Sequence, residues 1–119
     1  MIYQDVPPYI DYAQQDVEFA KQDVELILSQ NAQIDSYTVL IWGNKLLVGV
    51  IPHPLYSRTQ REELSARIKS DINDAYGFEE VLVSFDTDVF YEINKLNKKS
   101  SLGDEDVSRL FYSVKVRRN

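Results

Sequence analysis

The chain contains no cysteine, and this absence removes a set of functions. Without thiols there are no disulfides, no thiolate metal sites and no cysteine nucleophile. The absence does not fix the compartment, because an exported bacterial domain can also lack disulfides. A chain of 119 residues can bury about two-thirds of its unfolded surface, so it needs neither a disulfide nor a metal to fold. We expect a single domain over residues 1–119, with a core at about residues 9–97 and residues 98–119 as a C-terminal extension.

Long apolar runs are missing as well. No stretch approaches the roughly 18 apolar residues that a membrane-spanning helix needs. Residues 1–8 lack the basic start and the apolar stretch of a signal peptide. The chain as printed is therefore expected to be soluble and without an anchor, and any export signal of the natural protein is expected to have been removed ahead of Met1.

Glycine and histidine are scarce, with four glycines and one histidine in the chain. The glycines are not grouped as a phosphate-binding loop requires. His53 could serve as a base together with Asp86 or Asp88, which makes a small hydrolase or ligand-binding enzyme the alternative function. The simpler interpretation places His53 in a loop between two prolines and lets the two aspartates cap a helix. We therefore predict no catalytic residue, no cofactor and no metal site.

Basic residues are in the minority, and their distribution is uneven. The net charge is −6, with −5 over residues 1–52, −5 over residues 53–94 and +4 over residues 95–119. An acidic body argues against a nucleic-acid-binding domain, which would present a basic face. The basic end could contact anionic lipid or an acidic partner, or it could be an ordinary solvated terminus.

What the sequence does contain is a clear amphipathic pattern over residues 9–30, which predicts a helix. Its apolar residues recur at spacings of three and four and form one stripe: Ala13, Val17, Ala20, Val24 and Ile27. The motif Gln-Asp-Val-Glu occurs twice, one heptad apart, as in a coiled coil. Two heptads are too few for a coiled coil, so we interpret the segment as a helix that packs on a sheet.

The strongest local signal is a β-hairpin. Two runs of β-forming residues, 37–42 and 45–51, are separated by Gly43-Asn44. Glycine at the first central position suits a two-residue type II′ turn, which pairs Trp42 with Lys45 and sets the register of both strands. One face of this hairpin is nearly all apolar and should contact the helices.

The opposite face of the hairpin is also too apolar to be wholly wet, because Leu40, Trp42 and Leu47 cluster there. Two interpretations stay open. The three residues form an exposed patch that binds a partner, or the C-terminal segment covers them.

After the hairpin the pattern predicts a helix, a strand and further helical segments. Ser57 and Gln60 form a capping box for a helix that ends at about Tyr76, and residues 80–85, 89–97 and 104–112 follow as a strand, a helix and a last short helix. The third strand is expected beside the first and parallel to it. The predicted fold class is α+β, a two-layer α-β-β-α-β(-α) sandwich in which helices cover one face of a three-stranded mixed sheet.

Three segments together carry a resemblance to a known family. Residues 37–50 read YTVLIWGNKLLVGV, a strand, a Gly-Asn turn and a strand that ends in V-x-V. Residues 63–75 read as a helix, and residues 81–88 read VLVSFDTD, a strand with an Asp-x-Asp step, followed by Glu92-Ile93 in a short helix. Over roughly residues 13–114 the chain resembles the YhcN/YlaJ family of sporulation lipoproteins. The order of elements is also similar to that of BON domains and of ring-building domains.

The resemblance implies a non-enzymatic, extracytoplasmic lipoprotein domain, lipid-anchored at a forespore or spore membrane and acting in germination or spore assembly. The chain departs from the family pattern at its start, where no signal peptide and no lipobox cysteine are found. We expect a protein partner or a membrane surface, and no nucleic acid. On the first interpretation of the outer face, Leu40, Trp42 and Leu47 make the contacts.

Overall fold

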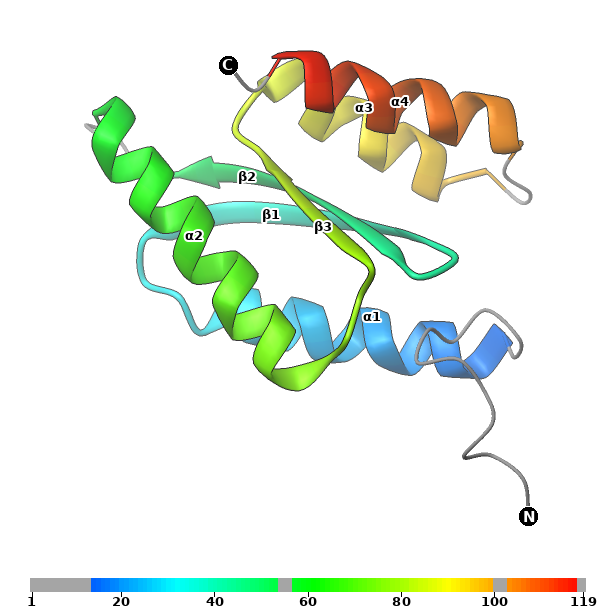
Figure 1. Ribbon diagram of the computed structural model, residues 1–119, viewed down its shortest axis with the longest axis horizontal. Helices are drawn as coiled ribbons and strands as arrows, with labels where there is room; N and C mark the ends of the chain where they lie inside the picture. The colour runs from blue at the N-terminus through cyan, green and yellow to red at the C-terminus, as the bar shows by residue number, and fades with distance from the viewer. Residues whose placement is uncertain (1–13, 54–56, 100–102, 118–119) are drawn as a thin grey trace.

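The computed structural model describes residues 14–53, 57–99 and 103–117. Its elements follow one another in the order that Figure 1 shows: α1 (Gln14–Ser29), β1 (Ile34–Trp42), β2 (Lys45–Pro52), α2 (Arg58–Ala75), β3 (Glu80–Ser84), α3 (Thr87–Asn97) and α4 (Asp104–Arg117). The prediction of an α+β fold with a three-stranded mixed sheet is confirmed.

The β1–β2 hairpin has the predicted register. Trp42 pairs with Lys45, and the antiparallel ladder continues to Ser36 opposite Ile51. Gly43 has φ +62°, the left-handed conformation that a primed hairpin turn requires at its first central position and that glycine adopts without a Cβ clash. The turn chemistry therefore fixes which residues of the hairpin share a face.

The third strand takes a different place from the predicted one. The sheet order is β1-β2-β3, and β3 runs parallel to β2 with Val48 opposite Val83. The expectation that the third strand lies beside the first and parallel to it is wrong on both counts, because β1 runs antiparallel to β2 and therefore also to β3. The α2 crossover returns the chain to the free edge of the strand it has just left, which is the shorter connection.

The first core lies between the sheet and helices α1 and α2. Helix α2 begins with the predicted capping box, in which the Ser57 hydroxyl accepts from the Gln60 backbone N–H and the Gln60 side chain accepts from the Ser57 N–H. Apolar residues one or two turns apart fill the space beneath the helices, among them Val24, Leu28, Leu64, Ile68 and Ile72 with Val39, Leu46, Val48 and Val50 of the hairpin. This is the helix-covered face that the sequence predicts.

A second core fills the opposite face of the sheet, so the fold has three layers (Figure 1). It joins Leu40, Leu47 and Leu82 of the three strands to apolar residues of α3 and α4, namely Val89, Ile93, Leu96, Val107, Leu110, Phe111 and Val114. The expectation of helices on one face only is wrong, because both faces of the hairpin are apolar and each needs a cover. Helix α4 also belongs to the core, whereas residues 98–119 were expected as an extension outside it.

Helix α3 is fixed to the sheet at two kinds of contact. At Gly49 the helix comes so close that a Cβ on this residue would lie 3.2 Å from Ile93 Cδ1 and 3.3 Å from Phe90 Cα. At the edge of the sheet the Asn97 side-chain amide donates to the Val39 carbonyl at 2.9 Å, and Thr38 Oγ1 donates to Asn94 Oδ1 at 2.6 Å. These contacts hold the second layer of helices in register with the sheet.

Candidate interaction surfaces

Two of the three hairpin residues predicted to bind a partner are buried. Leu40 is 2% exposed and Leu47 is fully buried, and both pack against α3 and α4. The expected exposed patch is therefore not present at these two positions. The other interpretation, in which the C-terminal segment covers the outer face, describes what the structure shows.

Trp42 is the remaining one of the three, and it lies half-buried at the rim of the second core. Its cross-strand neighbour Lys45 belongs to a small charged cluster, with Lys45 Nζ 4.0 Å from Glu80 Oε1 and Lys115 Nζ 2.9 Å from Glu80 Oε2. The cluster ties α4 to the start of β3, although partly exposed pairs of this kind add little stability. A partner could therefore reach Trp42 only at the edge of the layer that α3 and α4 form over the sheet.

His53 lies beside an acid other than the two predicted for it. Its Nδ1 is 3.8 Å from Asp35 Oδ1 across the hairpin, and both side chains are about half exposed. Asp86 is the N-cap of α3 and its Oδ1 accepts from the Asp88 backbone N–H at 2.8 Å. The residues that line the groove at Asp86 include Arg58 and Arg61 of α2 but not His53. The structure thus gives Asp86 the capping role and places Asp88 in the first turn of α3, where a negative charge favours the helix dipole.

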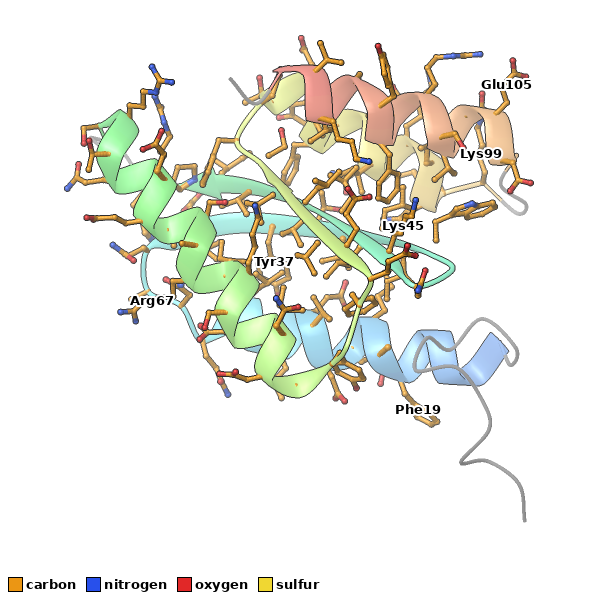
Figure 2. All side chains as sticks on the ribbon, in the orientation of Figure 1. Phe19, Tyr37, Lys45, Arg67, Lys99 and Glu105 are labelled. Atoms are coloured by element: carbon orange, nitrogen blue, oxygen red, sulfur yellow. The ribbon has the colours of Figure 1, made fainter. Side chains whose placement is uncertain are left out.

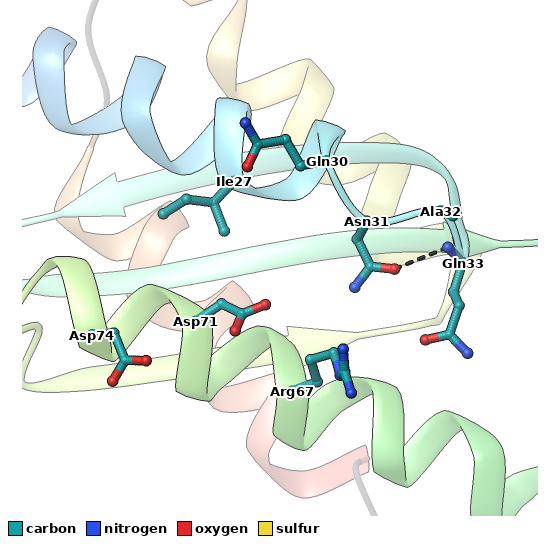
Figure 3. Close-up of a pocket in the computed structure, with 8 residues that line it drawn as sticks. All are labelled: Ile27, Gln30, Asn31, Ala32, Gln33, Arg67, Asp71 and Asp74. Carbon is teal, nitrogen blue, oxygen red and sulfur yellow. Dashed lines mark hydrogen bonds between the residues drawn. The ribbon is translucent and has the colours of Figure 1, made fainter.

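An open pocket of about 620 Å³ lies between the end of α1 and the middle of α2 (Figure 3). Amide side chains from the α1–β1 turn line one side and charged side chains of α2 line the other: Gln30, Asn31, Gln33, Arg67, Asp71 and Asp74. Asn31 is already engaged, because its Oδ1 accepts from the Gln33 backbone N–H at 2.9 Å. The pocket offers hydrogen bonds and charge to a polar ligand, and the described residues that line it include no serine, threonine, histidine or lysine.

Tyr76 and Asp23 join α2 to α1 next to this pocket. The Tyr76 hydroxyl donates to Asp23 Oδ2. Partial burial, together with the hydrogen bond to Asp23 and the negative charge of that carboxylate, raises the pKa of Tyr76 to about 12. The tyrosine is therefore a structural clasp that stays protonated at neutral pH.

Large apolar side chains on the outer helix faces are the surface feature that the sequence interpretation did not single out. Among the described residues five are more than half exposed: Phe19 and Leu26 of α1, Tyr91 of α3, and Tyr112 and Val116 of α4. The sequence contains an indication of the α1 pair, since Phe19 and Leu26 are apolar but fall outside the predicted stripe of this helix. Figure 2 shows Phe19 directed away from the sheet. Because the sheet faces are sealed, these helix faces are apolar surfaces that a partner can reach.

Among residues 14–53, 57–99 and 103–117 no group of three or more histidine, cysteine or acidic side chains is placed to hold a metal ion. In the same residues no helix combines the length and the hydropathy that crossing a bilayer requires.

Comparison with known proteins supplies one match. A family model described as sporulation lipoprotein YhcN/YlaJ matches residues 9–113, which is most of the chain. No curated protein matches the chain, and no solved structure matches it.

Proposed function

The chain belongs to the sporulation lipoprotein family YhcN/YlaJ, and on this premise we propose that it works in spore formation as a non-enzymatic contact domain outside the cytoplasm. A lipoprotein is held at a membrane by its lipid, so the folded domain is free to bind whatever faces that membrane. We place this membrane at the forespore or spore surface and the action in spore assembly or germination.

The observation that carries the proposal is the distribution of apolar surface. Both faces of the sheet are sealed by helices, yet α1 and α4 each expose two large apolar side chains. A small domain gains nothing in stability from exposed side chains of this size, and apolar groups on an outer surface are typical of a site that binds another molecule. By contrast, His53 lies beside Asp35, and Asp86 accepts a hydrogen bond from the backbone of α3.

The test uses a strain of the spore-forming host in which the gene is deleted and variants of the full-length lipoprotein are supplied. A contact variant carries Phe19→Ser, Leu26→Ser, Tyr112→Ser and Val116→Ser. A matched chemistry variant carries His53→Ala and Asp88→Ala, both at exposed positions. Circular dichroism and thermal unfolding of the purified domains first establish that both variants fold.

We expect the contact variant to behave like the deletion in spore yield, heat resistance or germination rate, while the chemistry variant behaves like the wild type. The reverse pattern would refute a contact function and favour the hydrolase alternative.

A further inference from the structure

We propose that the open pocket between the α1–β1 turn and α2 binds a free amino acid of the lysine type, which carries one carboxylate and two ammonium groups. The carboxylate lies on Arg67, the α-ammonium on Asp71 and the side-chain ammonium on Asp74. This site goes beyond the proposed contact function and is independent of it, because none of these side chains belongs to the exposed apolar faces.

The charges of the pocket form one stripe along α2. Arg67, Asp71 and Asp74 are spaced by four and three residues, so they share one side of the helix. Their steps along the helix axis are about 6 Å and about 4.5 Å. All three are exposed and line the pocket of about 620 Å³. Figure 3 shows Arg67 and Asp71 directed toward the α1–β1 turn, so the charges face the space between the two walls.

The stripe has no counter-charge in the protein. Within the described residues no ion pair joins Arg67, Asp71 or Asp74 to another side chain. Asp23 of α1, beside the pocket, is engaged by the Tyr76 hydroxyl. The order of signs along α2 is positive, negative, negative. A ligand with one carboxylate and two ammonium groups supplies the opposite charge for each of the three.

The wall formed by the α1–β1 turn supplies a hydrogen-bond donor and an apolar strip. The Asn31 Oδ1 accepts from the Gln33 backbone N–H, which leaves the Asn31 Nδ2 as a donor that can join Arg67 in holding the carboxylate (Figure 3). Ile27 and Ala32 are the apolar residues of the lining. They can contact the four-carbon stem of a lysine, whose ends are polar while its middle is apolar.

Both walls are held in place without a ligand. Ile68 and Ile72 lie between the charged positions of α2 and are at most 1% exposed in the first core. The Gln33 carbonyl accepts from the His53 N–H at 3.1 Å, and the Tyr76 clasp joins α2 to α1. Groups that are already positioned lose less freedom on binding. Because an open pocket encloses only part of a ligand, we expect a Kd on the order of 1 mM.

Other small ligands match this lining less well. An inorganic anion would meet two carboxylates, and a polyamine would place a positive charge against Arg67. A neutral sugar would displace water from three charges without pairing any of them. The mixed signs of the stripe therefore favour a ligand that itself carries both signs.

Chemical-shift titration of the isotope-labelled chain with L-lysine tests the proposal, at concentrations up to about 20 mM, well above the expected Kd. We expect saturable shifts of the backbone amides of residues 30–33 and 67–74. Three analogues each lack one charge: lysinamide the carboxylate, Nα-acetyl-lysine the α-ammonium and norleucine the side-chain ammonium. Each should bind about three- to fivefold more weakly, the loss expected for one exposed ion pair.

Variants of α2 assign each ligand charge to its partner. Arg67→Gln should weaken the binding of lysine and leave that of lysinamide unchanged, because both changes remove the same pair. By the same reasoning Asp71→Asn should leave Nα-acetyl-lysine unchanged, and Asp74→Asn should leave norleucine unchanged. The control Glu63→Gln removes an exposed charge of α2 outside the pocket lining and should bind lysine like the wild type. Circular dichroism establishes that the variants fold.

Three outcomes would overturn the inference. Lysine produces no saturable shifts, or any of the analogues binds as tightly as lysine, or Glu63→Gln weakens binding as much as Asp71→Asn. The last result would mean a general attraction of a cation to an acidic protein. None of these outcomes decides the contact function, because the pocket variants retain the four exposed apolar side chains that the sporulation test replaces.

Discussion

The second core makes a quantitative prediction at Leu47. This side chain lies on the central strand, is fully buried, and is enclosed by Leu40 and Leu82 of the neighbouring strands and by α3 and α4 above. Leu47→Ala removes three carbon atoms from a site where close contacts on all sides limit collapse, and such changes cost about 2–5 kcal/mol. We expect about 3–4 kcal/mol, in the upper half of this range because helices and strands enclose the site.

Urea unfolding followed by the fluorescence of Trp42 measures this loss. Trp42 is the only tryptophan of the chain and lies at the rim of the same core, so its emission reports the state of this layer. A domain of this size typically loses about 1–3 kcal/mol of its unfolding free energy per molar urea. The midpoint should therefore fall by more than about 1 M with an unchanged slope.

Leu26→Ala is the matched control, since the same side chain is 57% exposed on α1. It should change the unfolding free energy by no more than about 0.5 kcal/mol. A cost below about 1 kcal/mol for Leu47→Ala would refute the argument, because it would mean that α3 and α4 do not seal this face of the sheet in solution.

Three further predictions concern the contacts between layers. Gly49→Ala should cost about 1–3 kcal/mol by overpacking, because the new Cβ would lie 3.0 Å from Thr38 Cγ2 and 3.3 Å from the Phe90 backbone; a denaturation midpoint equal to that of the wild type would contradict this close approach. Asn97→Ala should cost about 1 kcal/mol by removing the donor to the Val39 carbonyl, and amide exchange along β1 should become faster, whereas unchanged exchange would mean that the bond does not protect this edge. The phenol of Tyr76 should ionise near pH 12 when absorbance at 295 nm is followed, since its pKa is raised from 10 in the unfolded chain to about 12. Stability present below pH 10 should then be lost as the pH rises from 10 to 12, by about 1 kcal/mol after allowance for solvent screening at this partly exposed group; Tyr76→Phe should abolish this part of the loss.

The hairpin was predictable from sequence because its information is local. Gly43-Asn44 determines the turn, and the turn determines that Trp42 faces Lys45 and that each apolar residue falls on a known face. The capping box at Ser57 is similarly contained within four residues. Features specified by neighbours along the chain can be derived from sequence with little more than steric and hydrogen-bonding rules.

The layer that covers Leu40 and Leu47 was not predictable in the same way. Their apolar character indicates that something must cover them, but it does not say whether a partner or the chain itself does so. The cover is supplied by Val107 and Phe111, at least 60 residues further along, whose helical spacing suits any apolar surface. The place of β3 also depends on which edge of the hairpin remains free, and that is a property of the assembled sheet.

The same distinction applies to the residues proposed to bind a partner. Trp42 was identified from sequence and is at least partly accessible, while Leu40 and Leu47 were assigned to a surface that the fold closes. Phe19 and Tyr112 could not be identified as surface residues from sequence with the same ease. An apolar residue outside the main stripe of a helix indicates a binding surface only once its solvent exposure is known.

The second core also has a consequence for how the domain is made. Its members run from Leu40 to Val114, so almost the whole chain must be present before this face of the sheet can close. A growing or exported chain can form the hairpin and the first layer early, and it then carries the uncovered leucines of the sheet until its last helix arrives. The incompletely folded chain is consequently more prone to aggregation than the finished domain. Removal of α4 by proteolysis would expose Leu40 and Leu47 again in a folded domain. An intact α4 is therefore needed to keep this apolar surface from binding other proteins non-specifically.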